Sequence, residues 1–130
     1  MAARRVLLIE DDAGSREAMG SLLSEEGHEV RTASSGKVGL EYARDFQPDT
    51  IICDFFLPDL DGLEVLRRTR AMRSGVFFIM LTADCGGGEV ERTLRREADL
   101  FLEKPVDVGF LNRTLRNDAG SPPKSAGALN

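Results

Sequence analysis

The sequence predicts an α/β fold, a doubly wound (βα)5 three-layer sandwich with a parallel five-stranded sheet between two layers of helices. Three observations predict this class. Apolar runs bounded by polar turns recur five times along the chain. Segments with the apolar spacing of helices separate the runs, which gives the alternation of a β-α-β series. Most of the runs are apolar throughout, as is typical of strands that helices cover on both faces.

The five runs expected to form strands are residues 4–9, 29–33, 50–53, 76–81 and 100–102. Four of them are almost wholly apolar and suit the interior of the sheet. The run 29–33 alternates polar and apolar residues, which suits a strand at the edge of the sheet.

Helical spacing is visible in the segments between these runs. The first segment carries Ala18, Met19, Leu22 and Leu23, and the third carries Leu63 and Leu66. The fourth opens with three glycines, each costing about 1 kcal/mol relative to alanine inside a helix, so the ordered helix is expected to begin near Glu89. The last helix is expected to start with Asp107 as its N-cap and to bury Val108, Leu111 and Leu115.

Composition narrows the function classes. The 130 residues include 17 Lys and Arg against 22 Asp and Glu, a formal charge of −5 with no basic stripe. Direct nucleic-acid binding by this domain is therefore not expected, because such binding depends on neutralising phosphates. The longest apolar run has six residues, against about 18 for a membrane span. With no signal peptide at its start, the protein is expected in the cytoplasm, with Cys53 and Cys85 as free thiols.

The domain is expected to occupy residues 1–118. Residues 119–130 are rich in Ser, Pro, Gly and Ala and offer little to bury, which is typical of a linker or a disordered tail.

Residues that could bind a ligand or take part in a reaction follow four of the predicted strands, at the edge where doubly wound sheets carry their sites. They are Glu10, Asp11, Asp12, Asp54, Thr82 and Lys104. Clustered carboxylates suit a hard cation such as Mg²⁺, which shares its coordination shell with phosphate. Asp54 could then attack phosphorus as a nucleophile, while Lys104 and Thr82 contact the phosphoryl oxygens. Taken singly, Asp12 is a helix cap, Thr82 a strand end and Lys104 a surface lysine, but their common placement favours a site.

Over residues 4–117 the chain resembles the receiver domain of two-component response regulators. The resemblance rests on spaced blocks at residues 6–12, 48–54, 57–62, 79–83 and 101–105, which read VLLIEDD, PDTIICD, LPDLDG, IMLTA and FLEKP. It implies a flavodoxin-like sheet of strand order 2-1-3-4-5. It also implies a cis peptide bond between Lys104 and Pro105.

The resemblance assigns a role to each site residue. Asp54 is the phosphoacceptor, and Lys104 is the lysine that binds the phosphoryl group. Asp11 ligates Mg²⁺ directly and Glu10 through water, with Asp54 and the backbone carbonyl of Phe56 completing the protein ligands. The switch pair is Thr82 and Phe101.

The implied function is signalling. A histidine kinase or histidine phosphotransfer protein would transfer a phosphoryl group from phosphohistidine to Asp54. The surface of the fourth helix, fifth strand and fifth helix would then signal to an output domain or a downstream protein, with homodimerisation on phosphorylation as one route. Such a domain is not an enzyme in the usual sense, although it catalyses its own phosphorylation and a slow dephosphorylation. Phe56 and Asp84 are expected to flank the path of the hydrolytic water.

Other classes of protein fit the sequence less well. A phosphatase of the haloacid dehalogenase class needs a second acid where this chain has Phe56, and the acids after the first strand would repel a flavin phosphate. One alternative stays open: a degenerate receiver that acts as a phosphorylation-independent protein interaction module. The chain also departs from the family at Glu97, where glycine is usual.

Overall fold

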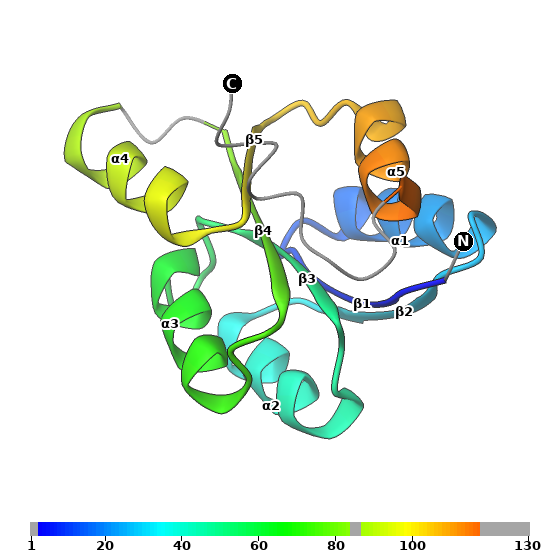
Figure 1. Cartoon of the computed structure of the whole chain (residues 1–130), viewed down its shortest axis with the longest axis horizontal. Coiled ribbons are helices and arrows are strands. Elements are labelled where there is room, and N and C mark those ends of the chain that lie inside the picture. Colours follow the sequence, from blue (N-terminus) through cyan, green and yellow to red (C-terminus); the bar gives the residue numbers. More distant parts are fainter. Residues whose placement is uncertain (1–2, 84–86, 118–130) are drawn as a thin grey trace.

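Alternating strands and helices make up the computed structural model, which describes residues 3–83 and 87–117 (Figure 1). The elements are β1 (Arg5–Ile9), α1 (Ala13–Glu25), β2 (Glu29–Ala33), α2 (Gly36–Phe46), β3 (Thr50–Asp54), α3 (Gly62–Met72), β4 (Phe77–Thr82), α4 (Gly88–Glu97), β5 (Leu100–Glu103) and α5 (Val108–Asn117).

The strands form one parallel sheet of order β2-β1-β3-β4-β5. This confirms the predicted class and strand order, with residues 29–33 at an edge. The register places Ile9 opposite Ala33 and Cys53, and Asp54 opposite Leu81. The carboxyl ends of β1, β3 and β4 therefore lie side by side, and this is where the predicted site residues gather.

Helices cover both faces of the sheet (Figure 1). On one face, Leu23 of α1 and Leu111 and Leu115 of α5 pack on β1, β3 and β4. On the other, α2, α3 and α4 contribute a second buried cluster that includes Ala43, Leu66 and Leu94. Burial of this apolar surface on two faces is the main term that stabilises the fold.

Element boundaries differ from the predictions by one residue at most strands. Helix α4 begins at Gly88, next to the predicted start near Glu89, and Gly87 is its N-cap. Both glycines have positive φ, +68° and +66°, which side chains other than glycine rarely adopt. The expected buried face of α5 is also narrower than predicted, because Val108 is only half-buried while Leu111 and Leu115 are fully buried.

Asp12 and Asp107 are the predicted helix caps. The Asp12 carboxylate accepts from the backbone N–H of Ser15 at 2.8 Å, and Asp107 accepts from that of Phe110 at 3.0 Å. Cys53 is buried and free, and burial raises the pKa of its thiol well above its usual value. Cys85 and the predicted tail lie outside the described residues. In the described part of the chain, the helices are too short or too polar to cross a lipid bilayer.

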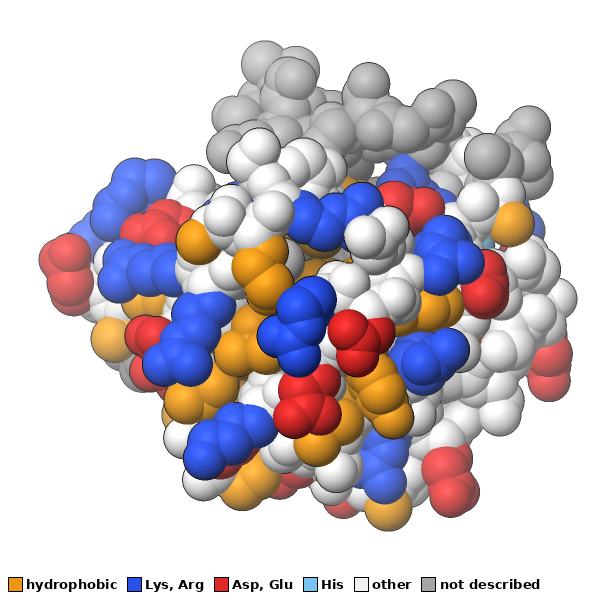
Figure 2. Space-filling view, turned by 90° about the horizontal axis from the view of Figure 1, so that it is seen from below, with side chains coloured by type: hydrophobic (Ala, Val, Ile, Leu, Met, Phe, Trp, Pro, Cys, Tyr) orange, Lys and Arg blue, Asp and Glu red, His pale blue; other side chains and the backbone are white. Residues whose placement is uncertain are grey.

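Charged side chains of both signs are interspersed on the face around α2 and α3, seen from below in Figure 2. Many are paired along or between helices, as Arg68 is with Glu64 at 2.7 Å within α3. Exposed pairs of this kind contribute little to stability singly.

The carboxyl-terminal end of α5 is fastened to the opposite edge of the sheet from the predicted site. Arg4, which precedes β1, donates from Nε to the carbonyl of Leu115 at 2.8 Å and from Nη1 to Thr50 Oγ1 at 3.1 Å. Arg116 pairs with Glu26, at the end of α1, at 2.6 Å. These contacts join the last turn of α5 to β1, β3 and α1.

His28, the one histidine of the sequence, is 6% exposed beside Arg4. The backbone N–H of Arg4 donates to His28 Nδ1 at 3.0 Å, so this nitrogen must be unprotonated. Burial, assisted by the charge of Arg4, lowers the pKa of His28 from its usual 6.5. Protonation would therefore oppose folding.

We expect the free energy of unfolding to fall as pH drops below 6.5 toward the lower pKa that His28 has in the folded state. The loss is about 1.4 kcal/mol for each unit by which the folded and unfolded pKa values differ. His28→Gln keeps a hydrogen-bond acceptor but does not titrate. The measurement is urea unfolding at about pH 7.5 and about pH 5.5, on either side of the histidine titration. Between these two values, the free energy of unfolding should fall more for the wild type than for the variant. Equal losses would contradict the assignment.

Candidate functional site

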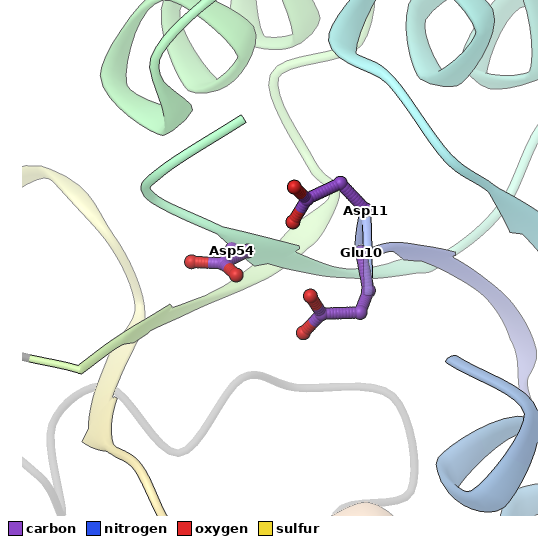
Figure 3. Close-up of side chains that lie close together, drawn as sticks. All are labelled: Glu10, Asp11 and Asp54. Atoms are coloured by element: carbon purple, nitrogen blue, oxygen red, sulfur yellow. The ribbon is translucent and has the colours of Figure 1, made fainter. Parts of the chain in front are cut away.

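The predicted acidic residues converge at the carboxyl edge of the sheet. Glu10 follows β1 and Asp54 ends β3, and these residues are only 3% and 5% exposed. Asp11 is exposed. One carboxylate oxygen from each of the three residues lies within 4.8 Å of the other two. Figure 3 shows the three carboxylates gathered around one space. Asp12 lies outside this group and caps α1, as predicted.

Lys104 supplies the positive charge of the site. Its Nζ lies 2.7 Å from Asp54 Oδ2 and 2.8 Å from Glu10 Oε1. Burial alone would lower the pKa of Lys104, but the hydrogen bonds that its ammonium donates to Asp54 and Glu10 outweigh burial and raise that pKa above its usual value. The ammonium is therefore held charged against the two carboxylates. The Lys104–Pro105 peptide bond is cis, as predicted.

For Glu10, burial outweighs the hydrogen bond that it accepts from Lys104. Burial is the largest effect and raises the pKa of its carboxyl, with the nearby charge of Asp54 acting in the same direction against Lys104. Two buried carboxylates, one exposed carboxylate and one lysine leave an excess of negative charge. Oxygen ligands with that excess are the donor set that Mg²⁺ prefers, so the residues present fit this ion.

The backbone around Asp54 is also organised. The N–H of Phe56 donates to Asp54 Oδ1 at 3.1 Å, and Phe56 forms an isolated antiparallel bridge with Asp61. Phe56 is 49% exposed, and its ring makes an edge contact with that of Phe55, with 4.9 Å between ring centroids. Residue 56 thus lies directly beside the carboxylate cluster, and the role of its carbonyl as a metal ligand stays a prediction. Asp84 lies outside the described residues.

Thr82, at the end of β4, is fully buried, and its hydroxyl oxygen has no hydrogen-bond partner among the described residues. Its carbonyl accepts from the backbone N–H of Lys104 at 2.8 Å, which ties the two residues together across β4 and β5. A buried hydroxyl without a partner costs about 1–3 kcal/mol. An oxygen of a bound group at this edge would remove that cost.

Phe101, the other predicted switch residue, is half-buried on β5 and packs against the core cluster under α3 and α4. The guanidinium of Arg95 lies 4.3 Å from the centroid of its ring, and Glu91 accepts from Arg95 at 2.8 Å. At the family departure, Glu97 pairs with Arg67 through two hydrogen bonds of 3.0 and 2.6 Å. Glu97 therefore joins α4 to α3, a role that glycine could not take.

Sequence reasoning missed two residues that hold the loops of the site. Asp59 accepts from the backbone N–H groups of Gly36 and Lys37 at 2.8 and 2.9 Å, which ties the loop after Asp54 to the start of α2. Arg16 donates to the carbonyls of Glu10 and Asp11 at 2.9 and 3.3 Å. Arg16 had a readable signal: side chains tilt toward the helix N-terminus, so a long donor in the first turns of α1 can reach back to the preceding loop.

The fold and the edge cluster define a doubly wound α/β domain with an acidic site at the carboxyl edge of its parallel sheet. A family model for the response regulator receiver domain matches residues 6–116. The chain therefore belongs to the response regulator receiver family.

Individual relatives agree with this family. The chain is 40% identical over 111 residues to the transcriptional regulatory protein AfsQ1 of Streptomyces coelicolor, covering 85% of this chain and 49% of that protein. It is 36% identical over 123 residues to the response regulator MprA of Mycobacterium leprae, covering 88% and 54%. The chain thus spans about half the length of these curated relatives.

Solved structures share the fold. A CheY-like receiver domain protein from Methanospirillum hungatei superposes with a TM-score of 0.81 at 27% identity, covering 89% of this chain and 93% of that one. The chemotaxis protein CheY4 of Vibrio cholerae gives 0.80 at 28% identity, covering 89% and 98%.

Proposed function

We propose that this receiver is active: Asp54 accepts a phosphoryl group from the phosphohistidine of a histidine kinase or histidine phosphotransfer protein in a reaction that depends on Mg²⁺. The observation that carries the proposal is the convergence of the Glu10, Asp11 and Asp54 carboxylates within 4.8 Å, with Lys104 Nζ 2.7 Å from Asp54. This gathering of negative charge is costly unless cations, here Lys104 and the proposed Mg²⁺, offset it.

The transfer can be assigned to groups in this chain. The Asp54 carboxylate attacks phosphorus, the phosphorus–nitrogen bond of phosphohistidine breaks, and the imidazole leaves with the electron pair and takes up a proton. Lys104 offsets the charge of the phosphoryl oxygens, and the buried Thr82 hydroxyl donates to one of them. Glu10, Asp11, Asp54 and the Phe56 carbonyl would hold Mg²⁺, which supplies further charge neutralisation when bound.

The signal would then leave through the surface of α4, β5 and α5. Thr82 and Phe101 would act as the switch pair, with the Thr82 hydroxyl moving toward a phosphoryl oxygen. The receiver would act in the cytoplasm, on an output domain or downstream protein, with homodimerisation as one route. It would not bind nucleic acid itself. The relative AfsQ1 is a transcriptional regulatory protein. Its name supports an output in transcriptional regulation for relatives of this chain.

The test uses a small phosphodonor with the wild-type chain, followed by intact-mass analysis. A single phosphoryl adduct is expected with Mg²⁺ and none after chelation of the metal. Absence of an adduct with Mg²⁺, both with the small donor and with a range of histidine kinases, would favour the interaction-module alternative and overturn the proposal.

The Phe56 side chain is expected to prolong the phosphorylated state. Because the backbone of residue 56 contacts Asp54 and the Phe56 side chain cannot orient a water molecule, we expect the ring to obstruct hydrolysis of the aspartyl phosphate. Phe56→Asn removes the ring and adds an amide that can hold water, so we expect faster decay of the adduct. The measurement is the loss of the adduct with time after the donor is removed. Phe110→Asn, the same change at an exposed phenylalanine of α5, is the control, and equal decay of wild type and Phe56→Asn would refute the obstruction.

A further inference from the structure

Arg16 contacts the backbone of Glu10 and Asp11 and not their carboxylates. Its side chain leaves the first turns of α1 and returns to the loop between β1 and α1, where Nη1 donates to the carbonyl of Glu10 at 2.9 Å and to that of Asp11 at 3.3 Å. One nitrogen thus bridges the backbones of both residues. The contacts are to carbonyls, so the carboxylates of Glu10 and Asp11 stay available to the site.

The same loop is held at other points. The Asp12 carboxylate caps α1 through Ser15, and the backbone N–H of Asp12 donates to Glu10 Oε2 at 3.1 Å. Asp11 is the exposed member of the acidic group, and its side chain is held less by the core than that of Glu10. The orientation of Asp11 therefore depends strongly on its backbone, which Arg16 contacts.

We propose that Arg16 is a positioning residue for the Mg²⁺ site: by holding the carbonyls of Glu10 and Asp11, it fixes the directions in which both carboxylates face the ion. This inference rests on the proposed function, because it assumes that the acidic group binds Mg²⁺. Partners that orient metal ligands from outside the coordination shell typically contribute about 10- to 100-fold in metal affinity.

Charge alone predicts the opposite effect of removing Arg16. A guanidinium near a cation site repels the cation, so its loss would strengthen Mg²⁺ binding through Coulomb's law. A positioning role predicts weaker binding. The sign of the change in Mg²⁺ affinity therefore separates the two.

Arg16 also lines a polar groove between α1 and β2, of about 890 Å³, with Glu17, Ser21 and Thr32 among its other lining residues. A side chain that served only to contact a partner protein there would leave Mg²⁺ affinity unchanged. The metal titration, which contains no partner, distinguishes this reading as well.

The experiment measures Mg²⁺ binding by isothermal titration calorimetry on the wild type, Arg16→Met, Arg16→Lys and the control Arg44→Met. Arg44 is an exposed arginine on α2, so its variant makes the same chemical change away from the site. We expect Mg²⁺ affinity about 10-fold weaker in Arg16→Met, intermediate in Arg16→Lys, which keeps the charge, and unchanged in Arg44→Met. The phosphodonor reaction should need correspondingly more Mg²⁺ for its half-maximal rate in Arg16→Met, while its rate at saturating Mg²⁺ is retained.

Unchanged or tighter Mg²⁺ binding by a folded Arg16→Met would overturn the proposal. If that variant unfolds, Arg16→Lys decides, since weaker binding supports positioning and equal binding refutes it. Failure of the wild type itself to bind Mg²⁺ would instead overturn the proposed function, and this outcome is seen before any variant is compared.

Discussion

Asp54→Asn is expected to abolish the phosphoryl adduct completely. The substitution keeps the volume of the side chain and one oxygen for the Phe56 N–H, but the amide is not a nucleophile toward phosphorus. The variant should fold, because Asp54 lies at the end of β3 and removing its charge relieves repulsion from Glu10. Intact mass after incubation with a small phosphodonor and Mg²⁺ measures the result.

The matched control is Asp12→Asn. Asp12 is the neighbouring acid that caps α1, and asparagine caps a helix about as well as aspartate. This variant should be labelled like the wild type. Labelling of Asp54→Asn at the wild-type level would remove Asp54 as the acceptor, even if the chain is phosphorylated elsewhere.

Gly62→Ala is expected to lower the free energy of unfolding. Gly62 begins α3, and its N–H donates to the carbonyl of Phe55 at 2.8 Å. A Cβ there would lie 2.8 Å from Phe55 Cα and 3.0 Å from the carbonyl oxygen of Asp54. These are backbone atoms, which cannot rotate away as a side chain can. We therefore expect a loss of about 1–3 kcal/mol in the free energy of unfolding, measured by urea denaturation.

Gly75→Ala provides the comparison for that measurement. A Cβ at Gly75 would meet no heavy atom within 4 Å, and the residue lies outside the left-handed region. Its change in stability should stay within about 0.5 kcal/mol. Because the clash at Gly62 falls on the backbone that carries Asp54, Gly62→Ala should also slow phosphoryl labelling. A variant as stable as the wild type would show that the loop can move without cost.

The fold was largely predictable because the determining signal is local. Runs such as 29–33 and 50–53 carry their burial pattern in consecutive residues, and parallel strands must bring their carboxyl ends to one edge. Glu10, Asp54 and Lys104 were therefore placed together before any distance was known. Caps such as Asp12 and Asp107 were equally readable, since they act on a backbone three residues away.

The contacts that sequence reasoning missed depend on how separate helices are placed. Arg67 meets Glu97 only because α3 and α4 pack side by side, and Arg95 meets Phe101 only because α4 lies over β5. No local pattern encodes those distances. The start of α4 near Glu89 was predictable because the helix cost of glycine is a local property, and the positive φ of Gly88 at the first position agrees with it.

The anchoring of α5 has a mechanical consequence. The helix begins close after Lys104, at the edge that bears the acidic cluster, and ends where Arg4 and Arg116 fasten it to the opposite edge. Because its carboxyl-terminal end is held by these contacts, α5 would turn about that end as a hinge. A small shift of the Lys104 loop would swing the near end of the helix through a greater distance than the hinge. A movement that begins at the carboxylates would thus displace the amino-terminal end of α5. The carboxyl-terminal end of α5 would move little.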